Sequence, residues 1–250
     1  MDKYNLGFIS EEKIFNHVKS TVEKYRFDIN LNSFNSNLID PIKLTFDSKI
    51  YKKSIKEVID DEIIRQIDKT NTNHIGYFHQ NLFKYLSSDW HVPTKNFDVI
   101  NEKLRFFVEI KNKHNTMNAR SSQKTYMIMM DKILKDPEAT CALVEIIAKN
   151  SQNIPWKISI DGKQMFDERI RRISIDKFYE IVTGDKFAFK KLCEKLHIII
   201  DDVVKSGKIK SSSNTVLKEL GELSSNFLKS LYLFSFKKYQ GFDNFDLYQL

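Results

Sequence analysis

The chain has 250 residues, of which 41% are hydrophobic and 29% charged, a composition typical of one folded globular domain and not of a disordered protein. Only 7 residues are glycine and 4 are proline, and no glycine-rich phosphate loop occurs, which argues against P-loop and dinucleotide-binding enzymes. The net charge of +7 favours a partner with a phosphate backbone, although lysine-rich surfaces also occur in proteins that bind no nucleic acid.

The cysteines and the terminal segment bear on the compartment. Cys141 and Cys193 lie in apolar segments without CxxC spacing, so they are expected to be buried thiols and not a disulfide or a zinc site. The first residues lack the pattern of a signal peptide, and no apolar run approaches the roughly 20 residues needed to span a bilayer. We therefore expect a cytoplasmic protein with no membrane partner.

The first third of the chain is predicted to be helical around one irregular stretch. Ser10 followed by two glutamates is a good helix start, and residues 30–52 are rich in Asn and Ser, with a break at Asp40-Pro41. The polar run at 69–73 is expected to end a helix. Apolar spacing predicts helices over 10–27, 54–69 and 74–86.

The period then changes to that of strands. Residues 97–100 form a short apolar strand, and after turn residues the run from Leu104 to Lys111 is apolar on both faces, as in a central strand. A polar loop leads into a helix over 121–134, and residues 141–148 read as another buried strand. A mixed β-sheet flanked by helices, an α/β (α+β) fold, is predicted.

The last hundred residues are predicted to be mostly helical. A short hairpin is expected at 156–162, followed by helices at 176–182, 185–205 and 215–236. We expect a single domain over 1–250, with a catalytic core at about 54–150, a helical N-terminal elaboration at 1–53 and a mostly helical C-terminal one at 151–250.

Two carboxylates and a lysine carry the chemistry. Alternate side chains of a strand share a face, so Glu109 and Lys111 point the same way, and Asp98 at the end of a neighbouring strand can reach Glu109. Two such carboxylates repel each other unless a cation lies between them, and hard oxygen ligands favour Mg²⁺. The Ile110 carbonyl is a third candidate ligand. Lys111 can orient a metal-bound water for phosphodiester hydrolysis.

The alternative is that these are solvated charges at strand ends, since a Glu-x-Lys pattern is very common. The charged pair directly follows the apolar residues 106–108, however, and charged side chains are rarely buried without partners or a metal. This context favours the catalytic interpretation.

Asp98 followed by Glu109-Ile110-Lys111 resembles the PD-(D/E)xK nuclease motif, with Phe97 in place of the proline, and the helix–strand–strand–helix–strand order resembles that superfamily's core. Several segments look like the type II restriction endonuclease family whose members cut GGNCC, the Sau and Eco isoschizomer group. They are residues 40–44, 73–80, 111–118, 176–179 and 183–186.

The resemblance implies a type II site-specific deoxyribonuclease that requires Mg²⁺ and hydrolyses double-stranded DNA at a short palindromic site. It also implies a homodimer, a companion DNA methyltransferase encoded as a separate protein, and a bacterial cytoplasmic location. Superfamily members often bring an acid or amide from a preceding helix to the metal, which makes Glu62 or Gln80 a candidate. Either side chain could instead only pack or face solvent.

Two further groups are candidates for DNA contact. The loop and helix start that follow Lys111 either lie against DNA or form an ordinary polar loop that caps the helix. An arginine cluster either reads guanine or forms a salt-bridged surface. The residues concerned are Lys113, His114, Asn115, Thr116, Asn118, Arg120, Ser122, Gln123, Lys124, Arg169, Arg171 and Arg172.

Three rival functions remain open from the sequence. They are a catalytically inactive DNA-binding protein of the same fold, a nuclease that processes structured DNA during repair, and a helical interaction protein without metal-dependent activity.

Overall fold

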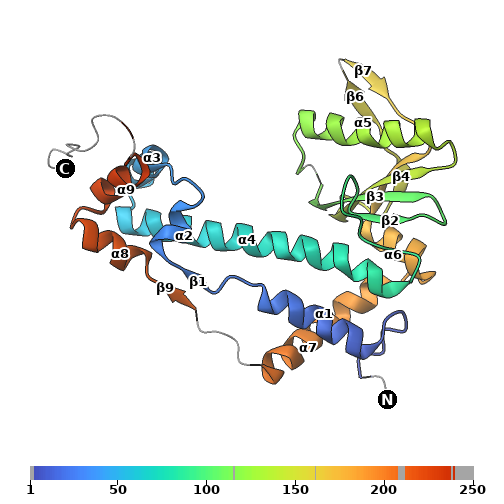
Figure 1. The fold of residues 1–250 in the computed structure, drawn as a ribbon, viewed down its shortest axis with the longest axis horizontal. Coiled ribbons are helices and arrows are strands. Elements are labelled where there is room, and N and C mark those ends of the chain that lie inside the picture. Colours follow the sequence, from blue (N-terminus) through green and yellow to red (C-terminus); the bar gives the residue numbers. More distant parts are fainter. Residues whose placement is uncertain (1–2, 115, 161, 208–211, 238, 240–250) are drawn as a thin grey trace. The chain divides into compact units, whose positions relative to one another are not determined.

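The computed structural model describes residues 3–114, 116–160, 162–207, 212–237 and 239 (Figure 1). The chain divides into two compact units. The first contains Met1–Glu23 and His74–Lys208, and the second contains Lys24–Asn73 and Ile209–Leu250. Residues 54–73, which the sequence assigns to the catalytic core, therefore belong to the second unit.

A five-stranded mixed sheet forms the centre of the first unit and confirms the predicted fold class. Its three inner strands are parallel, and an antiparallel strand closes each edge. In spatial order the strands are β2 (Val99–Asn101), β3 (Phe106–Lys113), β4 (Thr140–Ile147), β8 (Ile170–Ser174) and β5 (Asn153–Pro155).

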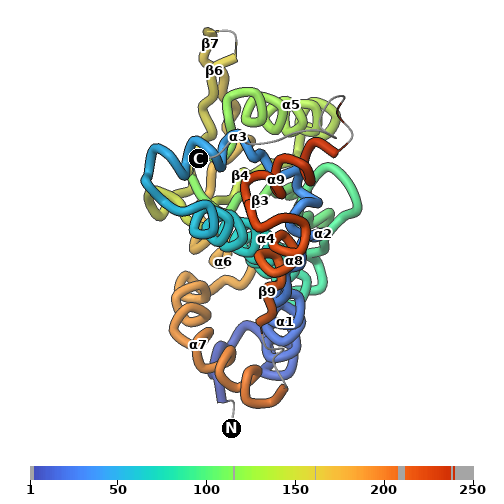
Figure 2. Tube along the Cα trace, turned by 90° about the vertical axis from the view of Figure 1, so that its left-hand side faces the viewer, coloured from blue at the N-terminus to red at the C-terminus, as the bar shows by residue number. Residues whose placement is uncertain are grey.

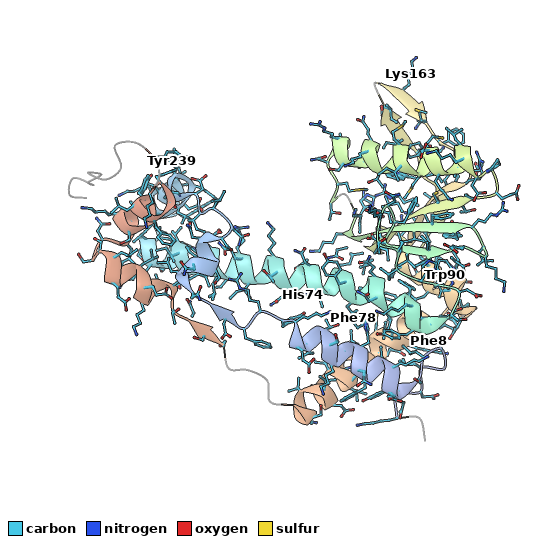
Figure 3. All side chains as sticks on the ribbon, in the orientation of Figure 1. Phe8, His74, Phe78, Trp90, Lys163 and Tyr239 are labelled. Atoms are coloured by element: carbon cyan, nitrogen blue, oxygen red, sulfur yellow. The ribbon has the colours of Figure 1, made fainter. Side chains whose placement is uncertain are left out.

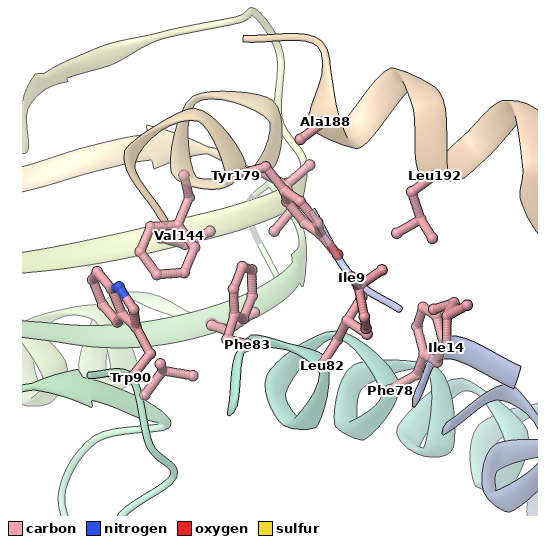
Figure 4. Close-up of a cluster of buried hydrophobic side chains, with 14 of the residues drawn as sticks. Ile9, Ile14, Phe78, Leu82, Phe83, Trp90, Val144, Tyr179, Ala188 and Leu192 are labelled. Atoms are coloured by element: carbon pink, nitrogen blue, oxygen red, sulfur yellow. The ribbon is translucent and has the colours of Figure 1, made fainter. Parts of the chain in front are cut away.

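Helices cover both faces of this sheet (Figure 1). The last turns of α4 (Ile55–Leu86) and α6 (Ile175–Thr183) contribute to one apolar cluster with the sheet, and α1 (Glu11–Glu23) and α7 (Ala188–Ser206) extend that cluster. Figure 4 shows Phe83, Val144 and Tyr179 within it. On the other face, α5 (Ala119–Lys135) buries Tyr126, Met129 and Ile133 against the sheet.

A small hairpin follows β5 in the same unit. Its strands are β6 (Ile158–Ile160) and β7 (Lys163–Met165), and β6 contacts α5. The hairpin extends beyond α5 (Figure 2), with Lys163 near its tip (Figure 3). A hairpin was predicted here, although residue 161 of its turn lies outside the described residues.

The second unit has its own helical core. Phe34, Ile59 and Leu220 are fully buried in one cluster of this unit. The elements are β1 (Asp28–Ile29), α2 (Leu31–Asn35), α3 (Pro41–Ile50), the first turns of α4, β9 (Ser213–Asn214), α8 (Val216–Leu223) and α9 (Phe227–Ser235).

Three predicted boundaries in the helical regions were wrong, and each has a local cause. The run at 69–73 contains no proline or glycine, and α4 continues through it. Asp40-Pro41 starts a helix: the Asp40 side chain accepts hydrogen bonds from two backbone N–H groups of α3, and proline occupies the first helical position. The helix predicted over 215–236 is interrupted, because Asn226 caps a new helix, α9.

Within the described part of the chain, no helix is long and apolar enough to cross a membrane.

Candidate active site

Asp98 lies just before β2 and is fixed to the neighbouring strand by backbone groups. Its N–H donates to the Val108 carbonyl at 2.8 Å, and its Oδ2 accepts a hydrogen bond from the Ile110 N–H at 2.7 Å. The carboxylate of one strand end is therefore held against the middle of β3. This is the arrangement predicted from the sequence.

Gln80 of α4 holds the other side of the same carboxylate. Its Nε2 donates to Asp98 Oδ1 and to the Asp98 carbonyl, each at 3.2 Å. One helical turn earlier, a Cβ added at Gly76 would lie 3.2 Å from the Asn112 Oδ1. The absence of a side chain at this position therefore allows α4 to approach the end of β3 closely.

Glu109 and Lys111 occupy alternate positions of β3 and share one face of the sheet. The Lys111 Nζ lies 2.6 Å from the Glu109 Oε1, and the two side chains are 31% and 20% exposed respectively. Both side chains of the pair are thus partly exposed.

Burial and neighbouring groups shift the pKa of both carboxylates. Burial raises the pKa of Asp98, while the hydrogen bond from Ile110 and the charge of Lys111 oppose the rise. Burial also raises the pKa of Glu109, and the nearby charge of Asp98 raises it further, against the effect of Lys111. Both acids therefore hold a proton more tightly than ordinary carboxyl groups, mainly because they are buried, and at Glu109 also because the charge of Asp98 lies nearby.

This donor set fits Mg²⁺ better than a transition metal. Within the described residues no group of three or more His, Cys, Asp and Glu side chains could hold a metal ion. Mg²⁺ needs fewer protein ligands, because it keeps several waters and binds through one or two carboxylates. Asp98 and Glu109 are the two carboxylates that would hold it.

Several polar side chains of the loop and helix start after Lys111 form hydrogen bonds within the protein. The Asn118 side chain caps α5, the Thr116 hydroxyl donates to the Lys113 carbonyl, and the Gln123 amide donates to the Ser159 carbonyl. Asn118 and Thr116 therefore do what the helix-capping alternative predicts. Asn115 lies outside the described residues.

Three cations in the same region remain available for a ligand. Lys113, Arg120 and Lys124 are exposed, and none of them forms an ion pair with another described residue. Ser122 lines a hollow together with Lys111 and Lys113. These four side chains are therefore the candidates for DNA contact in this segment.

The arginine cluster divides into two kinds. Arg169 pairs with Asp167 at 2.8 Å, and Arg171 pairs with Glu168 and hydrogen-bonds to Asn153. Arg169 and Arg171 therefore fit the salt-bridged alternative. Arg172 is also salt-bridged, to the buried Glu145, but its side chain in addition lines the hollow beside Lys111.

Of the two further metal-ligand candidates, Gln80 contacts Asp98, whereas Glu62 has its partners elsewhere in the chain. Glu62 belongs to the second unit, where Arg65 donates to both of its oxygens at 2.5 and 2.6 Å and Gln66 donates at 3.1 Å. These contacts hold the pKa of Glu62 below its usual value despite burial. Glu62 is thus a structural residue of its own unit.

Sequence reasoning missed one charged residue on the catalytic face. Glu145 of β4 is only 2% exposed, and its carboxylate pairs with Arg172 and contacts His114. The signal was present in the sequence: an acid stands in the strand Cys141–Ile147 at a position where alternation predicts a buried side chain.

Comparison with known proteins gives a consistent result. A family model described as Eco47II restriction endonuclease matches residues 6–205. The chain is similar to the type II restriction enzyme Sau96I of Staphylococcus aureus, with 35% identity over 85% of this chain and 86% of the relative. It is also similar to the type II restriction enzyme Eco47II of Escherichia coli, with 30% identity over 80% of this chain and 88% of the relative.

Proposed function

Because the chain belongs to the Eco47II restriction endonuclease family, we propose that it cuts double-stranded DNA at GGNCC in a magnesium-dependent reaction. Family membership makes the protein a type II restriction endonuclease, that is, a site-specific nuclease. The metal, the recognition sequence and the catalytic residues are the parts that the proposal adds.

One observation carries the catalytic assignment. Asp98 and Glu109 come from neighbouring strands and lie close together: burial raises the pKa of both acids, and the charge of Asp98 raises the pKa of Glu109 further. A divalent ion bound by both carboxylates would remove this repulsion. The Ile110 N–H points to Asp98, and a strand residue directs its N–H and C=O toward the same neighbour, which makes the Ile110 carbonyl a third ligand.

The protein groups then have distinct roles. Asp98 and Glu109 hold the ion, and Gln80 keeps the Asp98 carboxylate in position through its amide. Lys111 orients the attacking water and balances the charge that develops on the phosphate. When bound, Mg²⁺ supplies a Lewis acid for the phosphate and lowers the pKa of a bound water.

A palindromic site has twofold symmetry, so the simplest enzyme that cuts both strands is a twofold dimer with one active site for each strand. We include a homodimer in the proposal for this reason. A companion DNA methyltransferase that protects the same site is part of it as well, since a host would otherwise lose its own DNA.

Digestion of a sequenced plasmid tests the proposed function. In the presence of Mg²⁺ we expect discrete fragments whose mapped ends all fall at GGNCC, and with EDTA we expect intact plasmid. Fragments that end at another common sequence would overturn the recognition assignment alone.

Two other outcomes of the same experiment would favour the rivals. Cutting of branched or nicked DNA without sequence preference would indicate a repair nuclease. Sequence-specific binding without cutting in Mg²⁺ would indicate an inactive DNA-binding protein of the same fold.

A further inference from the structure

Glu145 is a buried carboxylate on the strand next to the proposed catalytic lysine. It is only 2% exposed, and its Cα is the register partner of Lys111 in the parallel β3–β4 pair. Paired residues of neighbouring strands direct their side chains to the same face, so Glu145 shares a face with Lys111 and Glu109. A buried carboxylate is costly unless it has partners.

Its partners come from two other segments. Arg172 of β8 donates through Nη2 to one carboxylate oxygen, and the Nδ1 of His114 lies 3.1 Å from the other. The same His114 Nδ1 lies 2.6 Å from the Arg172 Nη2. Arginine, glutamate and histidine therefore form one cluster, in which the Arg172 guanidinium lies against both the Glu145 carboxylate and the His114 ring.

The cluster contains one of two charge pairs on this face of the sheet. Lys111 pairs with Glu109, Arg172 pairs with Glu145, and both cations line the same hollow. Glu145 is the carboxylate that lines this hollow among the described residues. Without it, the Arg172 guanidinium would repel the Lys111 ammonium and compete for Glu109.

The cluster also fixes the end of the catalytic strand. The His114 N–H donates to the Ile147 carbonyl of β4 at 2.9 Å, and the His114 ring contacts Glu145 on the same strand. β3 ends at Lys113, so His114 is the next residue of the chain. Its backbone and its side chain both contact β4. Lys111 lies three residues before this anchor.

We infer that Glu145 is a positioning residue of the active site, which holds Arg172 and His114 so that Lys111 stays paired with Glu109 and the end of β3 stays in place. This inference rests on the proposed function. Glu145 itself contacts no reacting group in this account, and it acts through Lys111 and through the chain at His114.

The competing explanation is that the Glu145–Arg172 pair only stabilises the fold. Replacing a buried ion pair by apolar side chains of similar volume is often neutral or stabilising. The double variant Glu145→Met/Arg172→Met therefore separates the two explanations. If the pair has only a structural role, this variant should fold and cut like the wild type.

We expect a different result in single-turnover cleavage with saturating enzyme, where weakened DNA binding does not limit the rate. The double variant should unfold at a temperature near that of the wild type but cut about 10- to 100-fold more slowly, the range typical of supporting residues around a metal site. Glu145→Gln, which keeps the shape and loses the charge, should also be slower, by a smaller factor. A wild-type rate constant in either folded variant would overturn the inference.

Glu168→Gln is the matched control. It breaks the exposed pair with Arg171 on the same strand β8 and should leave the rate constant unchanged. The wild type is measured in the same series, so the two proposals fail separately. If the wild type does not cut, the proposed function fails, and if it cuts as fast as the Glu145 variants, only the positioning role fails.

Discussion

The two faces of the central sheet use the same three strands for different purposes. Toward α4 and α6, the strands β3, β4 and β8 present only apolar side chains to the core, among them Val108, Val144 and Ile173. Toward α5, the same strands are apolar at their beginnings and charged at their ends. The difference shows that one face holds the sheet together, while the other combines packing with a charged site.

Neighbouring residues of β8 show the contrast most clearly. Ile173 is 1% exposed in the apolar cluster, whereas Arg172, one residue earlier, points to the opposite face and pairs with Glu145. A substitution at Ile173 should therefore lower the stability of the fold, and one at Arg172 should slow the reaction.

The largest effect is expected from Lys111→Ala on the charged face. Removal of the ammonium group should slow single-turnover cleavage by about 10²- to 10³-fold, because a positioned charge that stabilises the transition state is lost. Lys113→Ala is the matched control, since Lys113 lies two residues later on the same strand. Lys113→Ala should weaken DNA binding and leave the single-turnover rate constant unchanged. An equal loss of that rate constant in both variants would contradict the role of Lys111.

On the apolar face, Ile173→Ala should act on stability and not on chemistry. The side chain is buried, so its truncation leaves a cavity and should lower the free energy of unfolding by about 2–5 kcal/mol. Chemical denaturation measures this loss. At a temperature where the variant is folded, its single-turnover rate should equal that of the wild type, and a strongly reduced rate would show that the two faces are not independent.

The unpaired cations next to the site should contribute through salt-dependent binding. The double variant Arg120→Ala/Lys124→Ala removes two exposed charges that have no ion-pair partner among the described residues. The slope of log Kobs against log salt should become shallower by about 1.8 if both residues contact phosphates. An unchanged slope in a fluorescence anisotropy titration would remove both from the DNA interface.

The smallest effect concerns the metal-free protein. Burial and the charge of Asp98 raise the pKa of Glu109 above its unfolded value, so the folded state binds this proton more tightly and loses stability as pH rises through the raised pKa. Glu109→Gln should therefore match or exceed the wild type in stability at neutral pH without metal, by about 1 kcal/mol or less. The difference should shrink as pH falls toward the ordinary carboxyl range, and thermal unfolding across pH measures it.

The sequence predicted most of the charged face because its chemistry is local. Glu109 and Lys111 lie on one strand at alternate positions, and a short turn brings Asp98 beside them, so spacing alone predicts their proximity. The sheet class and the helices on both faces followed from the change of period. Glu145 was missed, since its partners are 27 and 31 residues away and only the pairing of β4 with β8 and β3 brings them together.

The helical regions were harder to predict because hydrogen bonds of individual polar side chains decide their boundaries. The Asn71 side chain of the polar run accepts a hydrogen bond from the Arg26 N–H, and the Thr70 hydroxyl donates to the Gln66 carbonyl within the helix. These contacts satisfy polar side chains that suggested a break. Likewise, the first helices after Asn30 depend on caps, which a search for apolar periodicity does not detect.

The central claim is that Asp98 and Glu109 jointly hold the metal ion that the reaction needs. The most direct test is single-turnover cleavage of a duplex with one GGNCC site by the wild type and by Glu109→Gln, measured as a function of Mg²⁺ concentration. We predict that the variant needs a higher Mg²⁺ concentration for half-maximal rate and that its maximal rate falls by about 10²- to 10³-fold. Equal maximal rates with the same half-saturating Mg²⁺ concentration would contradict it.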